Sequence, residues 1–260
     1  MPPLSQSFRK AKKPHTKKKQ VGCLLIHGFT GNPKSVEGVA DFLARRDVQV
    51  SLPRLPGHGT RPEDLLDCRW QEWAGAIEEA YVDLSHECDE VFLCGLSMGG
   101  TLALNVAVNH PVAGVVTLAA PIVFPRWQQV TVRYLKHIRT FRHKKDGEDV
   151  SDTAARAYLD SYRKYPYFSI EQLFLLTNHV RHQLSRIAVP VLVVHSRQDH
   201  TVDFSNADRI LEGISSEDKE KVTLERSFHI ITVDCEKNLV CDAIWRFITE
   251  HSKVLTVPRP

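Results

Sequence analysis

Short apolar runs alternate with longer helix-like segments along most of this chain, and this alternation limits the folds open to it. The strand-like runs are Val21–Ile26, Val48–Leu52, Glu90–Cys94, Gly114–Leu118, Val191–His195 and Lys221–Leu224. Four of them are continuous apolar blocks, which is typical of parallel strands covered on both faces. The helix-like segments between them are Ser35–Arg45, Trp70–Ser85, Met98–Asn109, Asn206–Gly213 and Glu236–Glu250. The alternation predicts an α/β fold with a mostly parallel central sheet and helices on both faces.

The alternation is interrupted once, between residues 122 and 187, where we expect no strand and the sequence is polar, helix-prone and rich in Arg, Lys, Tyr and Phe. A segment of this length is too long for an ordinary connection, so it should have structure of its own. We interpret residues 122–187 as a short helical cap over the C-terminal edge of the sheet, where open α/β sheets bind ligands. The core is then 21–121 and 188–260. Two ordinary surface helices with a loop are the alternative.

Composition and charge exclude several classes of function. The chain has 260 residues, of which 42% are hydrophobic and 25% charged, so it can bury the core of one α/β domain. A net charge of +3 gives no reason to expect nucleic-acid binding by the body of the protein. Much of the positive excess lies in residues 1–20, which we expect to form a basic, flexible arm. Docking of this arm on phosphate or anionic lipid is the alternative.

The lack of recognisable targeting signals and the pattern of cysteines predict a cytoplasmic location. No run approaches the roughly twenty apolar residues that a transmembrane helix needs. No apolar stretch follows the basic N-terminus, so a secretory signal is not expected. The six cysteines are scattered without a C-x-x-C pair, which favours reduced thiols in the cytoplasm. No close grouping of metal-ligand residues and no phosphate-binding loop is found, and a homodimer is left open.

The segment Gly95-Leu96-Ser97-Met98-Gly99 follows a strand-like run directly and precedes a helix-like one. Gly-x-Ser-x-Gly between a strand and a helix is the pattern of a nucleophile elbow. The serine of such an elbow sits in a strained turn, so the residues two before and two after it must lack side chains. The turn holds the hydroxyl clear of the sheet. We therefore predict that Ser97 is a nucleophile.

A second loop supports this reading. The run Leu24-Leu25-Ile26 leads into His27-Gly28-Phe29-Thr30-Gly31, at the place where this fold carries a donor for an oxyanion. We expect the N–H groups of Phe29 and of Met98 to form the oxyanion hole. His27 could be read as a base, but it precedes the serine in the chain. We expect it to support the loop instead.

The acid and the base should follow the serine in that order. Asp199 comes just past the strand-like run Val191–His195, and Asp203, four residues on, is its rival. His229 follows the last strand-like run, whereas His200 adjoins the proposed acid and His251 lies beyond the last helix. In this hypothesis the imidazole of His229 takes the serine proton, and Asp199 holds its tautomer and stabilises the imidazolium.

Longer stretches make the interpretation more specific. The segments "HGFTGNPKSV", "LPRLPGHGTRPEDL", "GLSMGGTLAL", "RQDHTVDFSNADRILEGISSEDKE" and "SFHIITVD" resemble those of bacterial monoacylglycerol lipases and small bacterial carboxylesterases. The resemblance implies an α/β-hydrolase fold with a short helical cap and a Ser97–Asp199–His229 triad. It further implies an oxyanion hole from Phe29 and Met98, no cofactor, and a small-molecule ester and water as reactants. The resemblance is weak within the cap.

Three functions are compatible with these residues. The first is hydrolysis of monoacylglycerols or similar short- and medium-chain esters through a serine acyl-enzyme. The second is acyl transfer by the same triad to an alcohol or thiol acceptor. The third is a receptor-like binding protein on a hydrolase scaffold, which the intact set of Ser97, Asp199 and His229 argues against. Enzymes that process epoxides or halides would have Asp at the elbow, so Ser97 argues against these activities.

Overall fold

The computed structural model describes residues 8–10, 19–144, 147–159 and 161–255. Seven strands form one sheet in the order β1-β3-β2-β4-β5-β8-β9. Their bounds are β1 Phe8–Lys10, β2 Val21–Ile26, β3 Gln49–Leu52, β4 Glu90–Leu96, β5 Gly114–Leu118, β8 Val191–Ser196 and β9 Lys219–Leu224. All neighbouring strands in it pair in parallel except β1, which runs antiparallel to β3. The predicted mostly parallel sheet is confirmed.

The six expected strands lie within one or two residues of the observed ones, and their burial explains why. Every residue of β2, β5 and β8 is buried, as expected for central strands covered on both faces. Strand β9 lies at the edge and is only partly buried, so its polar N-terminal half hid its true start at Lys219.

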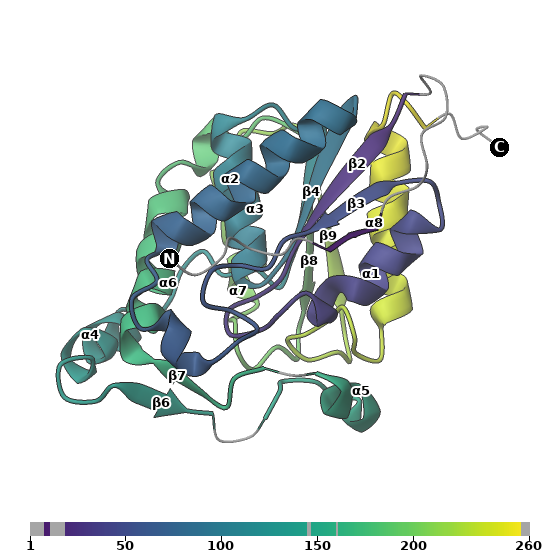
Figure 1. Ribbon diagram of the computed structural model, residues 1–260. Helices are drawn as coiled ribbons and strands as arrows, with labels where there is room; N and C mark the ends of the chain where they lie inside the picture. Colours follow the sequence, from purple (N-terminus) through teal and green to yellow (C-terminus); the bar gives the residue numbers. More distant parts are fainter. Residues whose placement is uncertain (1–7, 11–18, 145–146, 160, 256–260) are drawn as a thin grey trace.

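Helices cover both faces of the sheet (Figure 1). One face packs against α1 and α8, and the other packs against α2, α3 and α7. The helix bounds are α1 Lys34–Ala44, α2 Trp70–Glu87, α3 Met98–Asn109, α7 Ser205–Gly213 and α8 Lys237–His251, with the 3₁₀ turns η1 Pro62–Leu65 and η2 Leu184–Arg186. Helix α3 is buried along nearly its whole length, which explains its apolar sequence. Because β2, β3, β4, β5, β8 and β9 are parallel, their C-terminal ends lie together at one edge of the sheet.

The segment 122–187 lies beyond that edge (Figure 1). It contains α4 Arg126–Leu135, α5 Thr153–Tyr158 and α6 Tyr167–Arg181. It also contains β6 Phe141–His143 and β7 Lys164–Pro166, which pair antiparallel. The expectation of no strand here was wrong. Both strands are three residues long and charged, and they pair across some twenty intervening residues, so no local period announces them. The boundaries of a cap domain stay a prediction.

Within the expected N-terminal arm, residues 8–10 form β1 and add an antiparallel edge to β3. This strand was not expected, because the basic residues of the arm weaken the apolar pattern that indicates a strand. Residues 1–7 and 11–18 of the arm lie outside the described residues. In the described ranges, none of the helices is both long and apolar enough to cross a membrane.

Candidate active site

Ser97 stands at the turn between β4 and α3, in a strained backbone conformation with φ 54° and ψ −122°. The glycines on either side allow this turn. A Cβ on Gly95 would lie 2.1 Å from the carbonyl oxygen of Gly99, and one on Gly99 would lie 2.2 Å from that of Ile26. Both contacts are with backbone, which cannot move aside as a flexible side chain would. The elbow therefore requires glycine at these two positions, as the motif predicted.

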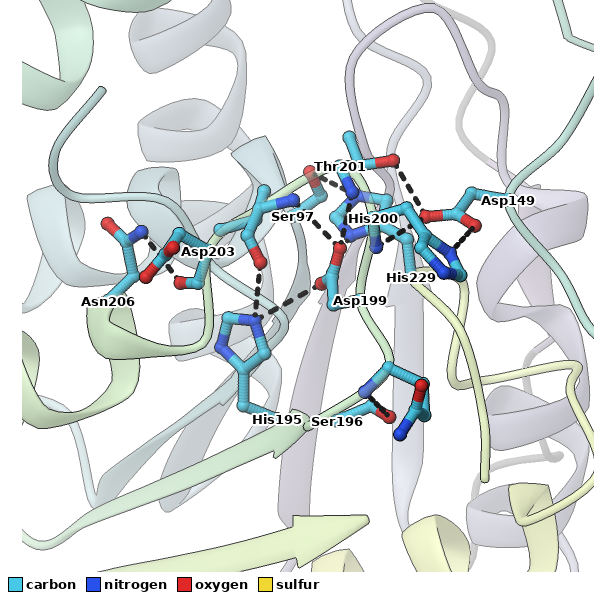
Figure 2. Close-up of polar contacts among 12 residues, drawn as sticks. Ser97, Asp149, His195, Ser196, Asp199, His200, Thr201, Asp203, Asn206 and His229 are labelled. Carbon is cyan, nitrogen blue, oxygen red and sulfur yellow. Dashed lines mark hydrogen bonds and ion pairs between the residues drawn. The ribbon is translucent and has the colours of Figure 1, made fainter. Parts of the chain in front are cut away.

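The three polar residues expected to act together do meet. The Oγ of Ser97 lies 3.0 Å from Nε2 of His229. On the other side of the ring, Nδ1 of His229 donates to Oδ2 of Asp199 at 2.8 Å. Ser97 comes from the end of β4, Asp199 from the loop after β8 and His229 from the loop after β9. These strands are separated in sequence, and only the sheet brings their C-terminal ends together (Figure 2).

His229 and Asp199 shift each other's pKa in opposite directions. Burial lowers the pKa of His229, but the carboxylate of Asp199 and its hydrogen bond raise it by more, so the pKa lies above its ordinary value. Burial raises the pKa of Asp199, yet the charge of His229 and hydrogen bonds from His195, His229 and Val202 hold it well below the ordinary value. Asp199 is thus a carboxylate at neutral pH, suited to stabilise an imidazolium.

The two backbone segments expected to bind an oxyanion both adjoin Ser97. Met98 is the first residue of α3, so its N–H has no acceptor within the helix. Phe29 and Gly28 line the cavity beside Ser97, and a Cβ on Gly28 would lie 3.2 Å from that of Ser97. The backbone of Gly28 therefore passes close to the serine.

His27 supports the loop 27–31 through hydrogen bonds, as expected. Its Nδ1–H donates to the carbonyl of Gly28 at 2.9 Å, and its Nε2 accepts from the N–H of Leu55 at 3.2 Å. Burial lowers the pKa of His27 to about 4, so the ring is neutral. His58 packs edge-on against it with ring centroids 5.3 Å apart, and donates to the carbonyl of Pro56.

The residues considered as alternatives for the acid and the base make other contacts. Asp203 accepts from the N–H and the hydroxyl of Ser205, at the start of α7. His251 lies between the carbonyl of Phe247 and the carboxylate of Asp218. His200 donates to Oδ1 of Asp149 at 2.9 Å and is exposed.

Asp149 is a residue that the sequence reasoning missed. Its carboxylate accepts from the N–H and the ring of His200 and from the hydroxyl of Thr201. Its carbonyl accepts from the N–H groups of His229 and Ile230, both at 3.1 Å. One residue of the inserted segment thus connects two loops (Figure 2). They are the loop after β8 that carries Asp199, called here the acid loop, and the loop after β9 that carries His229, called here the base loop. No local motif surrounds it, so only the tertiary contacts reveal it.

Asp234 was missed for the same reason. Its buried carboxylate accepts from the N–H groups of Ser151, Asp152, Phe228 and Cys235. Phe228 precedes the base, so this carboxylate joins the base loop to the inserted segment.

A cavity of about 720 Å³ opens over Ser97 and His229. Its apolar wall comes from α6 and from the residues just before α4: Phe124, Ile170, Leu173 and Phe174. Its polar wall comes from β6 and the segment around α5: Arg142, Lys144, Glu148, Asp149 and Arg156. No group of three or more His, Cys, Asp or Glu within the described ranges is placed to hold a metal ion.

An aromatic residue of the inserted segment can line the cavity or be buried in the interior of the protein. Tyr165 lines the cavity, and its ring meets that of Phe29 at 5.7 Å. Tyr162 and Tyr167 are buried, and the hydroxyl of Tyr162 donates to the carbonyl of Gly57. Trp127, Tyr134 and Tyr158 are exposed and contribute to neither role.

The chain belongs to a family of serine hydrolases, since residues 17–236 match the model of the serine aminopeptidase S33 family. It is 36% identical over 239 residues to a thermostable monoacylglycerol lipase from Bacillus sp. strain H-257, covering 89% of this chain and 92% of that protein. It is 29% identical to a carboxylesterase of Bacillus subtilis strain 168, covering 86% and 91%. Among solved structures, one of the metagenome-derived lipolytic enzymes described under LipS and LipT superposes with a TM-score of 0.87 at 29% identity, covering 96% and 99%. The predicted α/β-hydrolase fold is confirmed.

Proposed function

We propose that this protein hydrolyses monoacylglycerols or similar short- and medium-chain carboxylic esters, with Ser97, His229 and Asp199 as its catalytic triad. The observation that carries the proposal is the pair of contacts that links Ser97 to His229 at 3.0 Å and His229 to Asp199 at 2.8 Å. This relay opens into a cavity large enough for a small ester. The named relatives, a monoacylglycerol lipase and a carboxylesterase, support ester hydrolysis.

The two-sided cavity supports an ester that has an apolar and a polar end. An acyl chain fits along the apolar wall near Phe124 and Phe174, which pack against each other at 4.7 Å. A hydroxylated alcohol fits along the polar wall, where Lys144 pairs with Glu148 at 2.9 Å. A monoacylglycerol has both ends, whereas a triacylglycerol has no polar end. We therefore expect long-chain triacylglycerol emulsions to be poor substrates.

The proposed reaction has two halves. Neutral His229 accepts the proton of Ser97 through Nε2 while Oγ attacks the ester carbonyl, and the N–H groups of Phe29 and Met98 bind the oxyanion. His229 then gives the proton to the leaving alcohol, and an acyl-enzyme forms on Ser97. Water repeats the sequence and releases the acid. Loss of one oxyanion donor would cost on the order of 3 kcal/mol of barrier.

A substrate panel tests the proposal. It contains p-nitrophenyl esters from acetate to palmitate, monoacylglycerols, a triacylglycerol emulsion and aminoacyl anilides, because the matched family model describes an aminopeptidase. We expect turnover of the esters by the wild type, none by Ser97→Ala, and covalent labelling of Ser97 by an alkyl phosphonate. Cleavage of the anilides alone, or labelling at another residue, would refute it. Competing alcohols added to the assay would reveal acyl transfer.

We also propose a cytoplasmic location and leave a homodimer as an expectation. All six cysteines, each within the described ranges, are free thiols, which is typical of reducing compartments.

The exposed apolar side chains of Trp127, Val130, Tyr134 and Ile138 follow one face of α4 and the turn after it, which supports self-association through this face. Light scattering on wild type and Ile138→Ser gives the mass that decides it.

A further inference from the structure

A second histidine contacts the carboxylate of Asp199. His195 is the fifth residue of β8 and is completely buried. Its Nε2 lies 3.1 Å from Oδ2 of Asp199 and 3.1 Å from the carbonyl oxygen of Val202. Oδ2 is the same oxygen that receives Nδ1–H of His229. In Figure 2, Asp199 lies between His195 and His229.

The surroundings of the ring decide where its proton lies. Both atoms near Nε2 are acceptors, a carboxylate oxygen and a carbonyl oxygen, so Nε2 must carry the hydrogen. The other ring nitrogen, Nδ1, is buried and meets no hydrogen-bonding partner among the described residues. A buried nitrogen without a partner costs free energy. The ring is therefore a poor space-filler for an interior strand, where the preceding Val193 and Val194 are apolar.

We propose that His195 is a positioning residue, which holds the carboxylate of Asp199 in the orientation that receives His229. The inference rests on the proposed function, since it assigns a partner to the triad. Oδ1 of Asp199 accepts from the N–H groups of Thr201 at 2.8 Å and Val202 at 2.7 Å. Oδ2 accepts from Nδ1–H of His229, and it shares the single Nε2–H of His195 with the carbonyl oxygen of Val202. Four donors thus fix the plane of the carboxylate, and His195 supplies the one that comes from the strand.

The donor also divides the charge of the carboxylate between two rings. A hydrogen bond to an ionised carboxylate lowers its proton affinity. Without it, the carboxylate rotates more freely, and its full charge acts on His229. We therefore expect loss of His195 to slow turnover and to stabilise the protonated form of His229.

Three substitutions separate the donor from the volume of the ring. In His195→Gln the amide nitrogen reaches the place of Nε2, so the bond to Asp199 is kept. In His195→Asn the amide nitrogen reaches only the place of Nδ1, and in His195→Phe the ring stays without a donor. We expect Gln to retain kcat within about threefold, and Asn and Phe to lose about ten- to a hundredfold with KM nearly unchanged.

The pH profile of kcat/KM distinguishes positioning from simple packing. In the Asn and Phe variants the acid limb should move to higher pH, because the unshared carboxylate raises the pKa of His229. The other charged and titratable groups around this pair are Asp149 and Lys144 from the inserted segment, His200 from the acid loop, and Asp203, which faces His195. All are unchanged in these variants, so the shift reports on position 195.

Several outcomes would overturn the proposal. Phe or Asn variants with wild-type kcat and an unmoved acid limb would do so, and so would a Gln variant that is impaired as much as Phe. If a variant fails to fold, ¹⁵N spectra of the wild type decide: Nε2 of His195 must be protonated and Nδ1 bare. A bare Nε2 refutes the inference. Failure of the proposed function gives a different pattern, in which Ser97→Ala keeps full activity.

Discussion

The elbow shows how single atoms determine the conformation of a reactive residue. Ser97 adopts φ 54°, a value that side chains rarely tolerate, because the strand before it and the helix after it meet at Gly95 and Gly99. The backbone strain is offset by the packing of α3, which is buried along its length. The chemistry of the site therefore depends on two residues that have no functional groups.

Gly99→Ala tests this dependence. Its Cβ would lie 2.2 Å from the carbonyl oxygen of Ile26, so β2 and α3 must separate. We expect the free energy of unfolding to fall by about 3 kcal/mol and esterase activity to be lost. The matched control is Gly38→Ala on the exposed face of α1, where the new Cβ would meet no described atom within 4 Å. It should be neutral or stabilising by up to about 1 kcal/mol in urea unfolding.

The pH dependence of activity is also decided at the residue scale. The pKa of His229 lies above the ordinary 6.5, because the carboxylate of Asp199 outweighs the effect of burial. The base must be neutral to accept a proton, so kcat/KM should rise with pH through a midpoint above 6.5. Stopped-rate assays on a soluble ester across about pH 5 to pH 9 give the profile. A flat profile, or a midpoint below 6.5, would contradict the assigned role.

At the scale of elements, the inserted segment bonds directly to the loops of the proposed active site. Asp149 bonds to both loops that carry the acid and the base, and Asp234 bonds the base loop back to Ser151 and Asp152. These contacts couple the position of the segment to the alignment of the triad. The polar wall of the cavity comes from the same segment.

Asp149→Ala should reveal this coupling. It removes the side-chain bonds to His200 and Thr201 and leaves the two carbonyl bonds to His229 and Ile230. The charge of Asp149 raises the pKa of His229, so its loss should move the acid limb to lower pH, opposite to His195→Phe. We expect kcat to fall severalfold. Asp208→Ala, which breaks an exposed ion pair with Lys221, is the control and should change neither quantity.

At the scale of the whole molecule, buried carboxylates govern stability in acid. Burial raises the pKa of Asp234, but hydrogen bonds from Ser151, Phe228 and Cys235 lower it by more. Asp199 is lowered in the same way. A folded pKa below the unfolded value of 3.8 adds stability that is present above 3.8 and lost as pH falls through the folded value.

Asp234→Asn tests this linkage. The amide keeps one acceptor oxygen and loses the charge, so the free energy of unfolding at neutral pH should fall by about 2 kcal/mol. The wild type should lose stability steeply below pH 3.8, and the variant less steeply. Urea titrations at neutral and acid pH measure both slopes. Parallel curves for the two proteins would show that Asp234 does not contribute to the linkage.

The local sequence alone determined the alternating strands and helices of the core and the order of the candidate residues. Continuous apolar blocks identified the buried parallel strands, and Gly-x-Ser-x-Gly identified the elbow, because burial on both faces and a strained turn each leave a local pattern. Asp199 and His229 could be selected because each follows a strand whose end must lie at the same edge of the sheet. These inferences need only chain order and the geometry of a parallel sheet.

The tertiary structure alone decided how these residues are supported. Strands β6 and β7 pair across the segment around α5, and Asp149, Asp234 and His195 contact the proposed triad or its loops from positions with no local signature. The apolar and polar walls of the cavity likewise come from different elements. Such contacts depend on which distant side chains meet after folding, whereas a local pattern records only how each segment is buried.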